Sequence, residues 1–577
     1  MKASDYIVRF LKRQGVTDVF GYPGGMVTHL MESFDRCKDA PRAHICYHEQ
    51  GCAMAACGWA ELTGLPGVAY ATSGPGATNL LTGIACAYFE SLPALFITGQ
   101  VNTYEMKGEL QVRQRGFQET DIISIAKPIT KLAMAVNDAA ELPAALELAF
   151  RTAMEGRRGP VLLDIPMNVQ RGEVDTEPGQ IAFESGADNE EACRAAVSAL
   201  CDALGRAKRP LILAGHGIAL SGQRDAFREL VGQLGIPVVT SMIAVDALAS
   251  HAPCNFGFVG AYGARPANWI VDHCDLLITL GSRLDCRQTG VNKSLFAPDA
   301  EIYRVDVDPG EMTNRVSETE HHIVLSLEEL LPQLVRATKK LRPQTEAWNR
   351  VCAEAKELLS RIDVGNPGND AAQALGKLLD PSAVVVTDVG QNQVWTAQSL
   401  EVRGEQRVLF SGGHGAMGYA LPASVGAALA TGGVPVICCT GDGGLQMNVQ
   451  ELQTVVREQL PVKIVLFNNH ALGMIHHFQE MYFDSNYVQT DAAKGFVTPD
   501  FAALARAYGL RFVRWEDQNA EELRVMLADN APLFVEIPLP QTTHVFPKLG
   551  MNKPIHEQEP PVPPEIFVHL DQLLRSC

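Results

Sequence analysis

The chain has 577 residues, of which 46% are hydrophobic, and a formal net charge of −18 at pH 7. A single hydrophobic core does not grow to this size, so about three domains of ordinary size are expected. The acidic balance excludes a nucleic-acid partner, whose phosphates need a basic face. The charged, amphipathic N-terminus and the lack of a long apolar run argue against a secretory signal and a membrane partner, so we expect a cytoplasmic protein. The 14 cysteines form no paired CxxC motifs, which is typical of reduced core residues.

Apolar segments alternate with amphipathic ones along the whole chain. This predicts the α/β class, with three doubly wound parallel-sheet domains at residues 1–175, 191–340 and 371–577. The stretches between them, Thr176–Glu190 and Leu341–Asp370, look like surface linkers, the second of which includes a charged helix. From Pro538 onward the chain is too rich in proline for regular structure, and it either folds over an edge of the site or is a tail.

In the first domain, the strand candidate RAHICY is followed directly by His48-Glu49-Gln50-Gly51. Glu49 therefore lies at the carboxyl edge of the predicted sheet, where ligands collect in open α/β folds. A glutamate that opens a helix is also explained by its favourable interaction with the helix dipole, so the sequence leaves both interpretations open.

The predicted central domain carries four loops rich in glycine or aspartate, the first of which follows the strand candidate RPLILA. They are Gly215-His216-Gly217, Gly260–Arg265, Gly281–Asp285 and Val305–Pro309. Such loops suit either tight turns between strand and helix or the binding of a nucleotide.

The most informative segment lies in the third domain, where the strand candidate Val434–Thr440 ends at Gly441-Asp442-Gly443-Gly444. Apolar spacing predicts a helix over Leu445–Gln459, and a second strand, Pro461–Phe467, ends at Asn468-Asn469. The carboxyl ends of parallel strands share one edge of a sheet, so we expect the aspartate and the second asparagine to meet. Oxygen ligands of low charge beside side-chain-free N–H groups suit Mg²⁺ that carries a diphosphate.

The first and third domains contain this unit twice. In the first, Gly74-Pro75-Gly76 precedes a predicted helix, Leu92-Pro93, a strand and the pair Gly99-Gln100, and the intervals match those of the third domain to within one residue. A duplicated unit fits a ligand that is held between two like domains.

These motifs resemble the signature of thiamine diphosphate (ThDP) enzymes, in particular the acetolactate synthase branch. The other matching segments extend along nearly the whole chain and are Tyr22–Gly25, His48–Gly51, Thr72–Asn79, Thr98–Val101, Gly116–Asp121 and Met417–Tyr419. The resemblance implies a pyrimidine-binding domain, a central nucleotide-binding-like domain and a diphosphate-binding domain. It also implies a homodimer or homotetramer, because the sites of this family lie at the subunit interface.

The resemblance implies roles for individual residues. Glu49 occupies the position of the glutamate that donates a proton to the pyrimidine ring and thereby activates the cofactor. Asp442, Asn469 and the backbone oxygen of Ala471 match the ligands of Mg²⁺.

Further implied contacts surround the cofactor. Met417 matches the apolar residue that supports its bent form, and Gly415 offers a carbonyl to the pyrimidine amino group. The remaining implied cofactor-binding residues are Gly390, Gln391, Asn392, Gly443, Gly444 and Met474. The implied residues of the reacting face are Gly25, Gln100, Gln118, Ile475 and Phe478.

In the acetolactate synthase branch, loops like the four of the central domain hold FAD, whose redox chemistry the reaction does not use. Other branches bind ADP there, or nothing. The sequence leaves these occupants open.

Three departures from the branch concern the acceptor substrate. Phe478 stands where the branch has tryptophan, Met167 replaces a common lysine, and Asn102–Gly116 is longer than the family pattern. The longer segment adds the cations Lys107, Arg113 and Arg115. They either favour an anionic or larger acceptor or are solvated loop charges, and we expect the donor chemistry of the branch with a different acceptor.

We therefore predict ThDP- and Mg²⁺-dependent decarboxylation of a pyruvate-like 2-oxo acid, with carboligation of the enamine to a second carbonyl. A C–C lyase or hydrolase, a simple 2-oxo acid decarboxylase and a flavin-using oxidase stay open as other enzyme functions. A noncatalytic ThDP-binding homologue or an assembly partner is the alternative from another class. The presence of Glu49, Asp442 and Asn469 argues against it.

Overall fold

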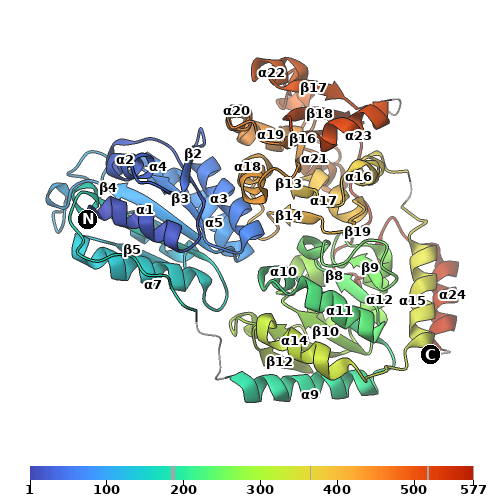
Figure 1. Cartoon of the computed structure of the whole chain (residues 1–577). Coiled ribbons are helices and arrows are strands. Elements are labelled where there is room, and N and C mark those ends of the chain that lie inside the picture. Colours follow the sequence, from blue (N-terminus) through green and yellow to red (C-terminus); the bar gives the residue numbers. More distant parts are fainter. Residues whose placement is uncertain (184–188, 364, 516–518, 576–577) are drawn as a thin grey trace.

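The computed structural model describes residues 1–183, 189–363, 365–515 and 519–575. They form three six-stranded sheets, each wholly parallel and flanked by helices, which confirms the predicted α/β class. Figure 1 shows the first domain on one side of the molecule and the third domain above the central one on the other side. Among these residues, no helix combines the length and the apolar character needed to cross a membrane.

The first domain has the sheet order β2-β1-β3-β4-β6-β5. Its strands are β1 (Asp18–Gly21), β2 (Arg42–Ile45), β3 (Gly67–Ala71), β4 (Ala94–Gln100), β5 (Leu132–Ala135) and β6 (Pro160–Pro166). Its α-helices are α1 (Ala3–Arg13), α2 (Thr28–Arg36), α3 (Glu49–Thr63), α4 (Pro75–Asn79), α5 (Leu81–Glu90), α6 (Ile122–Ala126), α7 (Leu142–Met154) and α8 (Met167–Gln170). The fully buried strands β3, β4 and β6 are apolar runs, as expected for a sheet covered on both faces.

The third domain has the order β14-β13-β15-β16-β18-β17, which corresponds strand by strand to that of the first domain. Its strands are β13 (Val384–Thr387), β14 (Arg407–Phe410), β15 (Val436–Gly441), β16 (Val462–Asn468), β17 (Arg511–Arg514) and β18 (Leu533–Pro538). Its α-helices are α16 (Pro367–Leu378), α17 (Gln391–Ser399), α18 (Ala420–Thr431), α19 (Asp442–Met447), α20 (Leu452–Arg457), α21 (Gly473–Tyr482), α22 (Phe501–Ala507) and α23 (Ala520–Ala528). The repeated unit seen in the sequence is therefore a repeat of topology.

The central domain has a different order, β12-β11-β10-β7-β8-β9. Its strands are β7 (Pro210–Ala214), β8 (Val238–Thr240), β9 (Asn255–Phe258), β10 (Leu276–Leu280), β11 (Glu301–Asp306) and β12 (Glu320–Val324). Its α-helices are α9 (Glu190–Arg206), α10 (Gly217–Leu220), α11 (Arg224–Leu234), α12 (Arg265–His273), α13 (Cys286–Thr289), α14 (Leu327–Thr338) and α15 (Glu346–Leu359).

The two predicted linkers differ in outcome. The described part of Thr176–Glu190 is mostly exposed and carries no helix or strand before α9, while residues 184–188 lie outside the described part of the chain. The surface-linker interpretation of Leu341–Asp370 is wrong for α15, which buries Trp348, Val351 and Ala355 in the core of the central domain. Charged residues on the outer face of this helix concealed the apolar stripe on its inner face.

The helix predicted over Leu445–Gln459 is interrupted. The chain forms α19, a 3₁₀ turn over Val449–Glu451 and then α20, with a break at Asn448 (φ −135°, ψ 32°). The Asn448 side chain donates to the carbonyl of Gly418 at 2.8 Å, and its oxygen accepts from Gln50 of the first domain at 3.3 Å. Bonds to other parts of the fold thus replace regular helix geometry at this position.

Helices α3 and α18 join the first and third domains through closely packed small residues. A Cβ at Gly58 would lie 2.1 Å from the carbonyl oxygen of Ala423, and one at Gly426 would lie 1.8 Å from that of Ala55. Only glycine permits this approach of the two backbones. Because α3 begins at Glu49, the same contact fixes the helix that carries the predicted catalytic carboxyl group.

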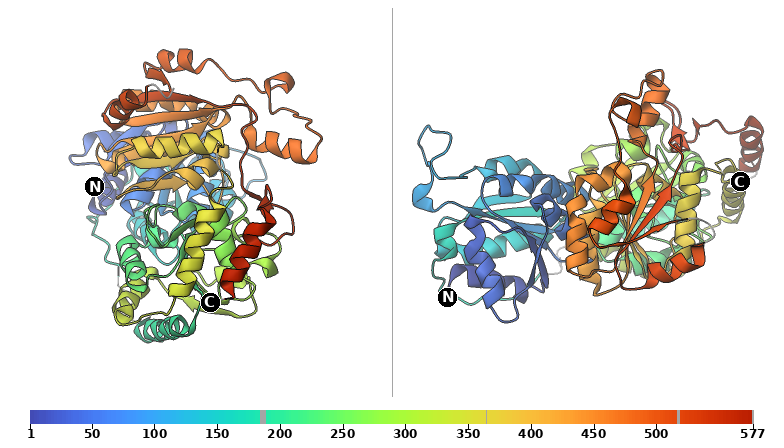
Figure 2. Two further views of the ribbon diagram at one scale, coloured as in Figure 1. Left: turned by 90° about the vertical axis from the view of Figure 1, so that its right-hand side faces the viewer. Right: turned by 90° about the horizontal axis from the view of Figure 1, so that it is seen from above.

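The expectation that the chain beyond Pro538 lacks regular structure is wrong. It forms a short antiparallel pair, β19 (Lys548–Leu549) with β20 (Gln558–Glu559), and a helix, α24 (Pro564–Leu574). Figure 1 and Figure 2 show this segment leaving the third domain and placing α24 beside α15 of the central domain. Prolines lie at the ends of these elements or beside them, so the high proline content indicates where helices and strands begin and end, not that regular structure is absent.

Candidate active site

The third domain has a cavity at the carboxyl edge of its sheet, where β13, β15 and β16 end. The predicted residues that line it are Gly390, Gln391, Asn392, Met417, Asp442, Gly443, Gly444, Asn469, Ala471, Met474 and Ile475. Gly415 and Phe478 lie outside the lining. The topology thus gathers most of the predicted third-domain residues at one place.

Asp442 is a buried carboxylate at the start of α19. Its Oδ1 accepts from the backbone N–H of Gly443 at 2.8 Å and its Oδ2 from that of Ala471 at 3.1 Å. Burial raises the pKa of Asp442 to about 7, although these hydrogen bonds lower it. In the described part of the chain it has no ion-pair partner, so a cation in the cavity would favour its charged form.

Asn469 is held in one orientation by a second amide. Its Nδ2 donates to Oε1 of Gln391 at 2.9 Å, and Nε2 of Gln391 donates to the carbonyl of Thr543 in the C-terminal segment at 3.0 Å. Asn469 Oδ1 accepts no hydrogen bond from the described residues and is free to act as a ligand. The C-terminal segment therefore supports this edge of the cavity from behind.

Two glycines of the cavity wall are tightly packed. A Cβ at Gly443 would lie 2.5 Å from Leu472, and one at Gly444 would lie 2.9 Å from the carboxylate of Asp388, so no side chain fits at either position. The N–H of Gly443 donates to Asp442, and the start of α19 at this strand-to-helix turn suits an anionic group.

Asp388 is a functional residue that the sequence reasoning missed, although its place directly after the strand Val384–Thr387 was a usable signal. It accepts from the N–H of Gly418 at 2.8 Å and from that of Val389 at 2.7 Å. Burial raises its pKa to about 6. Asp388 thereby fixes the loop that brings Met417 to the cavity.

Asn392 and Gly415 have structural features that the motif comparison did not show. Asn392 donates to the carbonyls of Asp388 at 3.0 Å and Cys439 at 3.2 Å, which ties together the ends of β13 and β15. Gly415 adopts a positive φ of 70°, in the region that favours glycine.

Helix α21 begins at Gly473, as predicted, and leads away from the cavity. Ile475 lines the cavity but remains 54% exposed, while Phe478, one turn further on, is 46% exposed. The Phe478 ring contacts that of Tyr482, with centroids 4.7 Å apart. This part of α21 thus presents an aromatic surface to solvent next to the cavity mouth.

The first domain forms a second group at the carboxyl edge of its own sheet. Glu49 is buried, and its Oε2 accepts from Nδ2 of Asn79 at 3.0 Å. Gln118 adopts a positive φ of 65° and packs on Gly74, while Gly25 is exposed and faces open space. These residues surround the Thr72–Asn79 loop that the sequence analysis identified.

Gln100 is directed into the protein rather than toward an open surface. Its Nε2 donates to the carbonyl of Thr120 at 2.9 Å and to Asp164 at 3.0 Å, and its Oε1 accepts from the N–H of Val101 at 3.0 Å. Burial raises the pKa of Asp164 to about 7. In this structure Gln100 therefore orders the end of β4, and a role on the reacting face stays a prediction.

The structure does not bring the two groups together. Gly25, Glu49, Gln100 and Gln118 do not line the third-domain cavity. One chain thus presents two separate half-sites, each at the carboxyl edge of one copy of the repeated topology.

Comparison with known protein families identifies the family of the chain. Three family models match successive parts of the chain, described as the thiamine pyrophosphate enzyme N-terminal TPP binding domain (residues 1–125), central domain (197–334) and C-terminal TPP binding domain (388–537). The chain belongs to the thiamine pyrophosphate enzyme family. The N- and C-terminal domains of that description are the two that carry the half-sites.

Relatives place this thiamine pyrophosphate enzyme in the acetolactate synthase branch. It is 37% identical to the acetolactate synthase isozyme 2 large subunit of Escherichia coli, over 95% of this chain and 97% of the relative. It is 34% identical to a probable acetolactate synthase large subunit of Methanocaldococcus jannaschii (93% and 92% covered) and 33% identical to the large subunit of Lactococcus lactis (96% and 95% covered).

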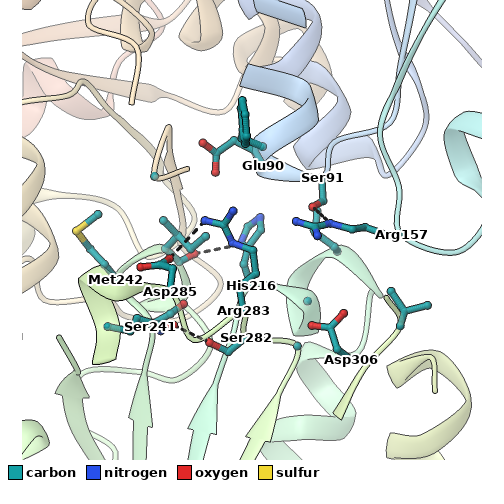
Figure 3. A pocket seen from close by; sticks show the side chains of 18 of the residues that line it. Glu90, Ser91, Arg157, His216, Ser241, Met242, Ser282, Arg283, Asp285 and Asp306 are labelled. Atoms are coloured by element: carbon teal, nitrogen blue, oxygen red, sulfur yellow. Dashed lines mark hydrogen bonds and ion pairs between the residues drawn. The ribbon is translucent and has the colours of Figure 1, made fainter. Parts of the chain in front are cut away.

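This thiamine pyrophosphate enzyme has a second, larger cavity of about 170 Å³ between its domains. The four loops of the central domain noted in the sequence contribute Gly217, Ala261, Tyr262, Gly281, Ser282, Arg283, Asp285, Asp306 and Val307 to its lining. Figure 3 shows Glu90 and Arg157 of the first domain facing Arg283 and Asp306 across the cavity, and Gly412 of the third domain completes the wall.

Arg157 and Glu90 had no signal in the sequence, because their roles depend on contacts between domains. Arg157 donates to Ser91 at 2.9 Å and to Asp308 of the central domain at 3.0 Å. Glu90 accepts from the backbone N–H of Gly413 in the third domain at 2.7 Å, and burial raises its pKa to about 7.

A neutral acid–base pair lies where α3 meets the central domain. Nδ1 of His216 lies 3.0 Å from the carbonyl of Ile243, which can only accept, so Nδ1 carries the proton and Nε2 a lone pair. Nε2 lies 3.5 Å from Oε1 of Glu61. Burial raises the pKa of Glu61 to about 8 and lowers that of His216 to about 4, so both side chains are neutral at pH 7.

Proposed function

We propose that this protein catalyses ThDP- and Mg²⁺-dependent decarboxylation of a pyruvate-like 2-oxo acid and joins the remaining unit to a second carbonyl compound. The observation that carries the proposal is the third-domain cavity, where a buried carboxylate without a cation partner among the described residues meets a free amide oxygen at the start of helix α19. The relatives, which are named as acetolactate synthases, support the same reaction class.

The residues present fit a magnesium diphosphate. Asp442, Asn469 Oδ1 and the backbone oxygen of Ala471 would hold Mg²⁺, which prefers oxygen ligands. Gly390 and Gly444 at the cavity wall would lie next to the phosphates.

ThDP, when bound, stabilises the carbanion that forms as the 2-oxo acid loses CO₂. The chain contributes positioning and proton transfer. Glu49 would hold a proton at the pyrimidine ring nitrogen, and Asn79 fixes the orientation of its carboxyl group. Met417 would support the cofactor between its two rings, on a loop that Asp388 anchors. Water exclusion would require that the open first-domain half-site cover the third-domain cavity.

The active site in this proposal is shared between subunits. Glu49 of one subunit would act on the cofactor that the third domain of its partner holds, so the protein would be a homodimer or homotetramer. The separation of the two half-sites within one chain supports this assembly. A cytoplasmic location is part of the same proposal.

We propose FAD as the occupant of the interdomain cavity. The cavity joins apolar walls to charged and polar groups, and the side chains of Ser241 and Gln288 in its lining contain buried polar atoms without a partner in the described residues. These features fit a ligand with both apolar and hydrogen-bonding parts. The two cavities share no lining residue, which favours a structural flavin over the oxidase alternative.

Product analysis tests the proposal. Purified protein with ThDP, Mg²⁺ and pyruvate, alone and with a panel of aldehydes and ketones, should release CO₂ and form a carbon–carbon bond. CO₂ with free aldehyde alone would favour the simple decarboxylase, and cleavage of a dione would favour the lyase or hydrolase.

Flavin content separates the remaining alternatives. We expect yellow protein that releases FAD on denaturation and whose colour survives pyruvate turnover under nitrogen. Stoichiometric bleaching by pyruvate would favour the oxidase. Protein that binds ThDP but releases no CO₂ from any 2-oxo acid would be a noncatalytic homologue.

A further inference from the structure

A cation lies against the aromatic surface of α21. Nζ of Lys548, which begins β19 in the C-terminal segment, lies 5.8 Å from the ring centroid of Phe478 and 5.7 Å from that of Tyr482. An ammonium at this distance interacts favourably with ring faces and keeps its full charge. Both rings therefore lie against the same ammonium.

Lys548 lacks the partner that a half-buried cation ordinarily has. Among the described residues it makes no ion pair, and its ammonium donates to a weak acceptor, Sδ of Met481, at 3.2 Å. Burial lowers its pKa, because its charge is partly desolvated without compensation. By contrast, Lys463 pairs with Asp529 at 2.7 Å.

The nearest acidic side chain on α21 is engaged elsewhere. Nε2 of His544 lies 2.9 Å from Oε2 of Glu480, and the hydroxyl of Tyr487 donates a hydrogen bond to the same oxygen at 3.4 Å. Lys548 is thus a partly buried cation without an anionic partner among the described residues, and it would attract an added anion.

The position of this cation links it to the candidate active site. Gly473, Met474 and Ile475 at the start of α21 line the third-domain cavity, and Phe478 follows one turn later, roughly 5 Å along the helix axis. The backbone next to Lys548 is fixed, because the N–H of Leu549 donates to the carbonyl of Ala261 at 2.7 Å. The ammonium therefore lies against the part of α21 that directly follows the cavity-lining residues.

Resting on the proposed carboligation, we propose that Lys548 is a specificity-determining residue that binds the carboxylate of the second substrate. It would select an acceptor that carries both a carbonyl group and a carboxylate over a neutral aldehyde, with Phe478 and Tyr482 holding the ammonium in place. Lys548 is itself partly exposed, so an anion can approach it from solvent.

The test compares two acceptors with the same R group, a 2-oxo acid (R–CO–COO⁻) and the neutral aldehyde without its carboxylate (R–CHO). With saturating pyruvate as donor, Lys548→Met should raise the KM for the 2-oxo acid about tenfold or more, and the aldehyde reaction should change little. Raised salt should shrink the difference between the wild-type protein and this variant. Lys548→Arg keeps the charge and should restore most of the preference.

Lys553→Met is the matched control, since Lys553 lies in the same segment and pairs with Glu559 at 3.1 Å. It should leave both acceptors unaffected. An equal loss on both acceptors in Lys548→Met, with no rescue by arginine, would assign the residue to stability and overturn the proposal, as would unchanged kinetics. Failure of the proposed function would show differently, as a wild-type protein that releases no CO₂ from pyruvate.

Discussion

The two cavities of this protein differ in how much of each a single chain completes. The interdomain cavity has walls from all three domains, closed by contacts such as Arg157 with Asp308 and Glu90 with the N–H of Gly413. The third-domain cavity is lined by residues of the third domain alone, and Glu49 of the first domain does not reach it. Folding of one chain thus suffices for the first cavity, while in the proposed function the second would be completed by a partner subunit.

Glu49→Gln is expected to have the largest effect on turnover and to leave the flavin content of the interdomain cavity unchanged. Turnover of pyruvate should fall by roughly 10²–10⁴-fold, because a positioned proton transfer is lost. Flavin content and thermal stability should persist, since Glu49 is remote from the interdomain lining. Exchange of the C2 proton of ThDP, followed by NMR, is the measurement, and Glu191→Gln on the exposed face of α9 is the control. Exchange at the wild-type rate would remove Glu49 from the mechanism.

A second expected effect is on the binding of cofactor. Asp442→Ala and Asn469→Ala should each weaken the binding of Mg²⁺ and of ThDP together, by roughly 10–100-fold, because in the proposed site these side chains would hold the metal that accompanies the diphosphate. Titration calorimetry checks this, with Glu49→Gln as the variant that should retain affinity. Unchanged ThDP affinity in both metal-ligand variants would show that the third-domain motif has been misread.

The neutral pair of Glu61 and His216 beside the interdomain cavity should make the stability of the folded protein depend on pH. Because the pKa of Glu61 rises from 4.5 to about 8 on folding, its contribution to stability is fully present below pH 4.5 and is lost as the pH rises through 8. Glu61→Gln lacks the titrating carboxyl group, so this part of its stability does not fall as the pH rises. The Tm of the variant should therefore exceed the Tm of the wild type by the largest margin at pH 8.5 and by the smallest at pH 4.5. An equal Tm difference at both pH values would show that Glu61 is charged in the folded protein.

The smallest effect is expected at the rim of the active site. Phe478→Ala should change the ratio of products formed from competing acceptors more than it changes pyruvate consumption, because Phe478 lies outside the cavity lining. Loss of decarboxylation at a fixed product ratio in Phe478→Ala would assign this face to the donor.

Arg113 and Arg115 are exposed residues of the longer loop, and charge reversal at both should raise the KM for the acceptor in a salt-dependent way.

The sequence was most informative where a site depends on strand ends. Asp442 and Asn469 follow neighbouring parallel strands, so topology alone brings them together. The duplicated motif likewise predicted two domains whose sheet orders proved to correspond. Both inferences rest on local order along the chain, which a sequence displays directly.

It was least informative where residues act across domains. Glu61, Glu90 and Arg157 look like surface charges in the sequence, and only interdomain packing buries or pairs them. The break at Asn448 has the same origin, because its side chain bonds to Gly418 and Gln50 from distant parts of the chain. The amphipathic face of α15 was hidden for a simpler reason, the charge of its outer side.

Because the C-terminal segment returns to the central domain, the domains are joined by different numbers of chain passages. The central and third domains are joined by two passages of the chain, through residues 360–366 and through residues 539–563, and α24 is packed into the central core by Leu570. The first domain is joined by one passage. Rotation of the central and third domains against each other would strain a closed ring of chain, whereas the first domain keeps its position through packing, above all of α3 on α18.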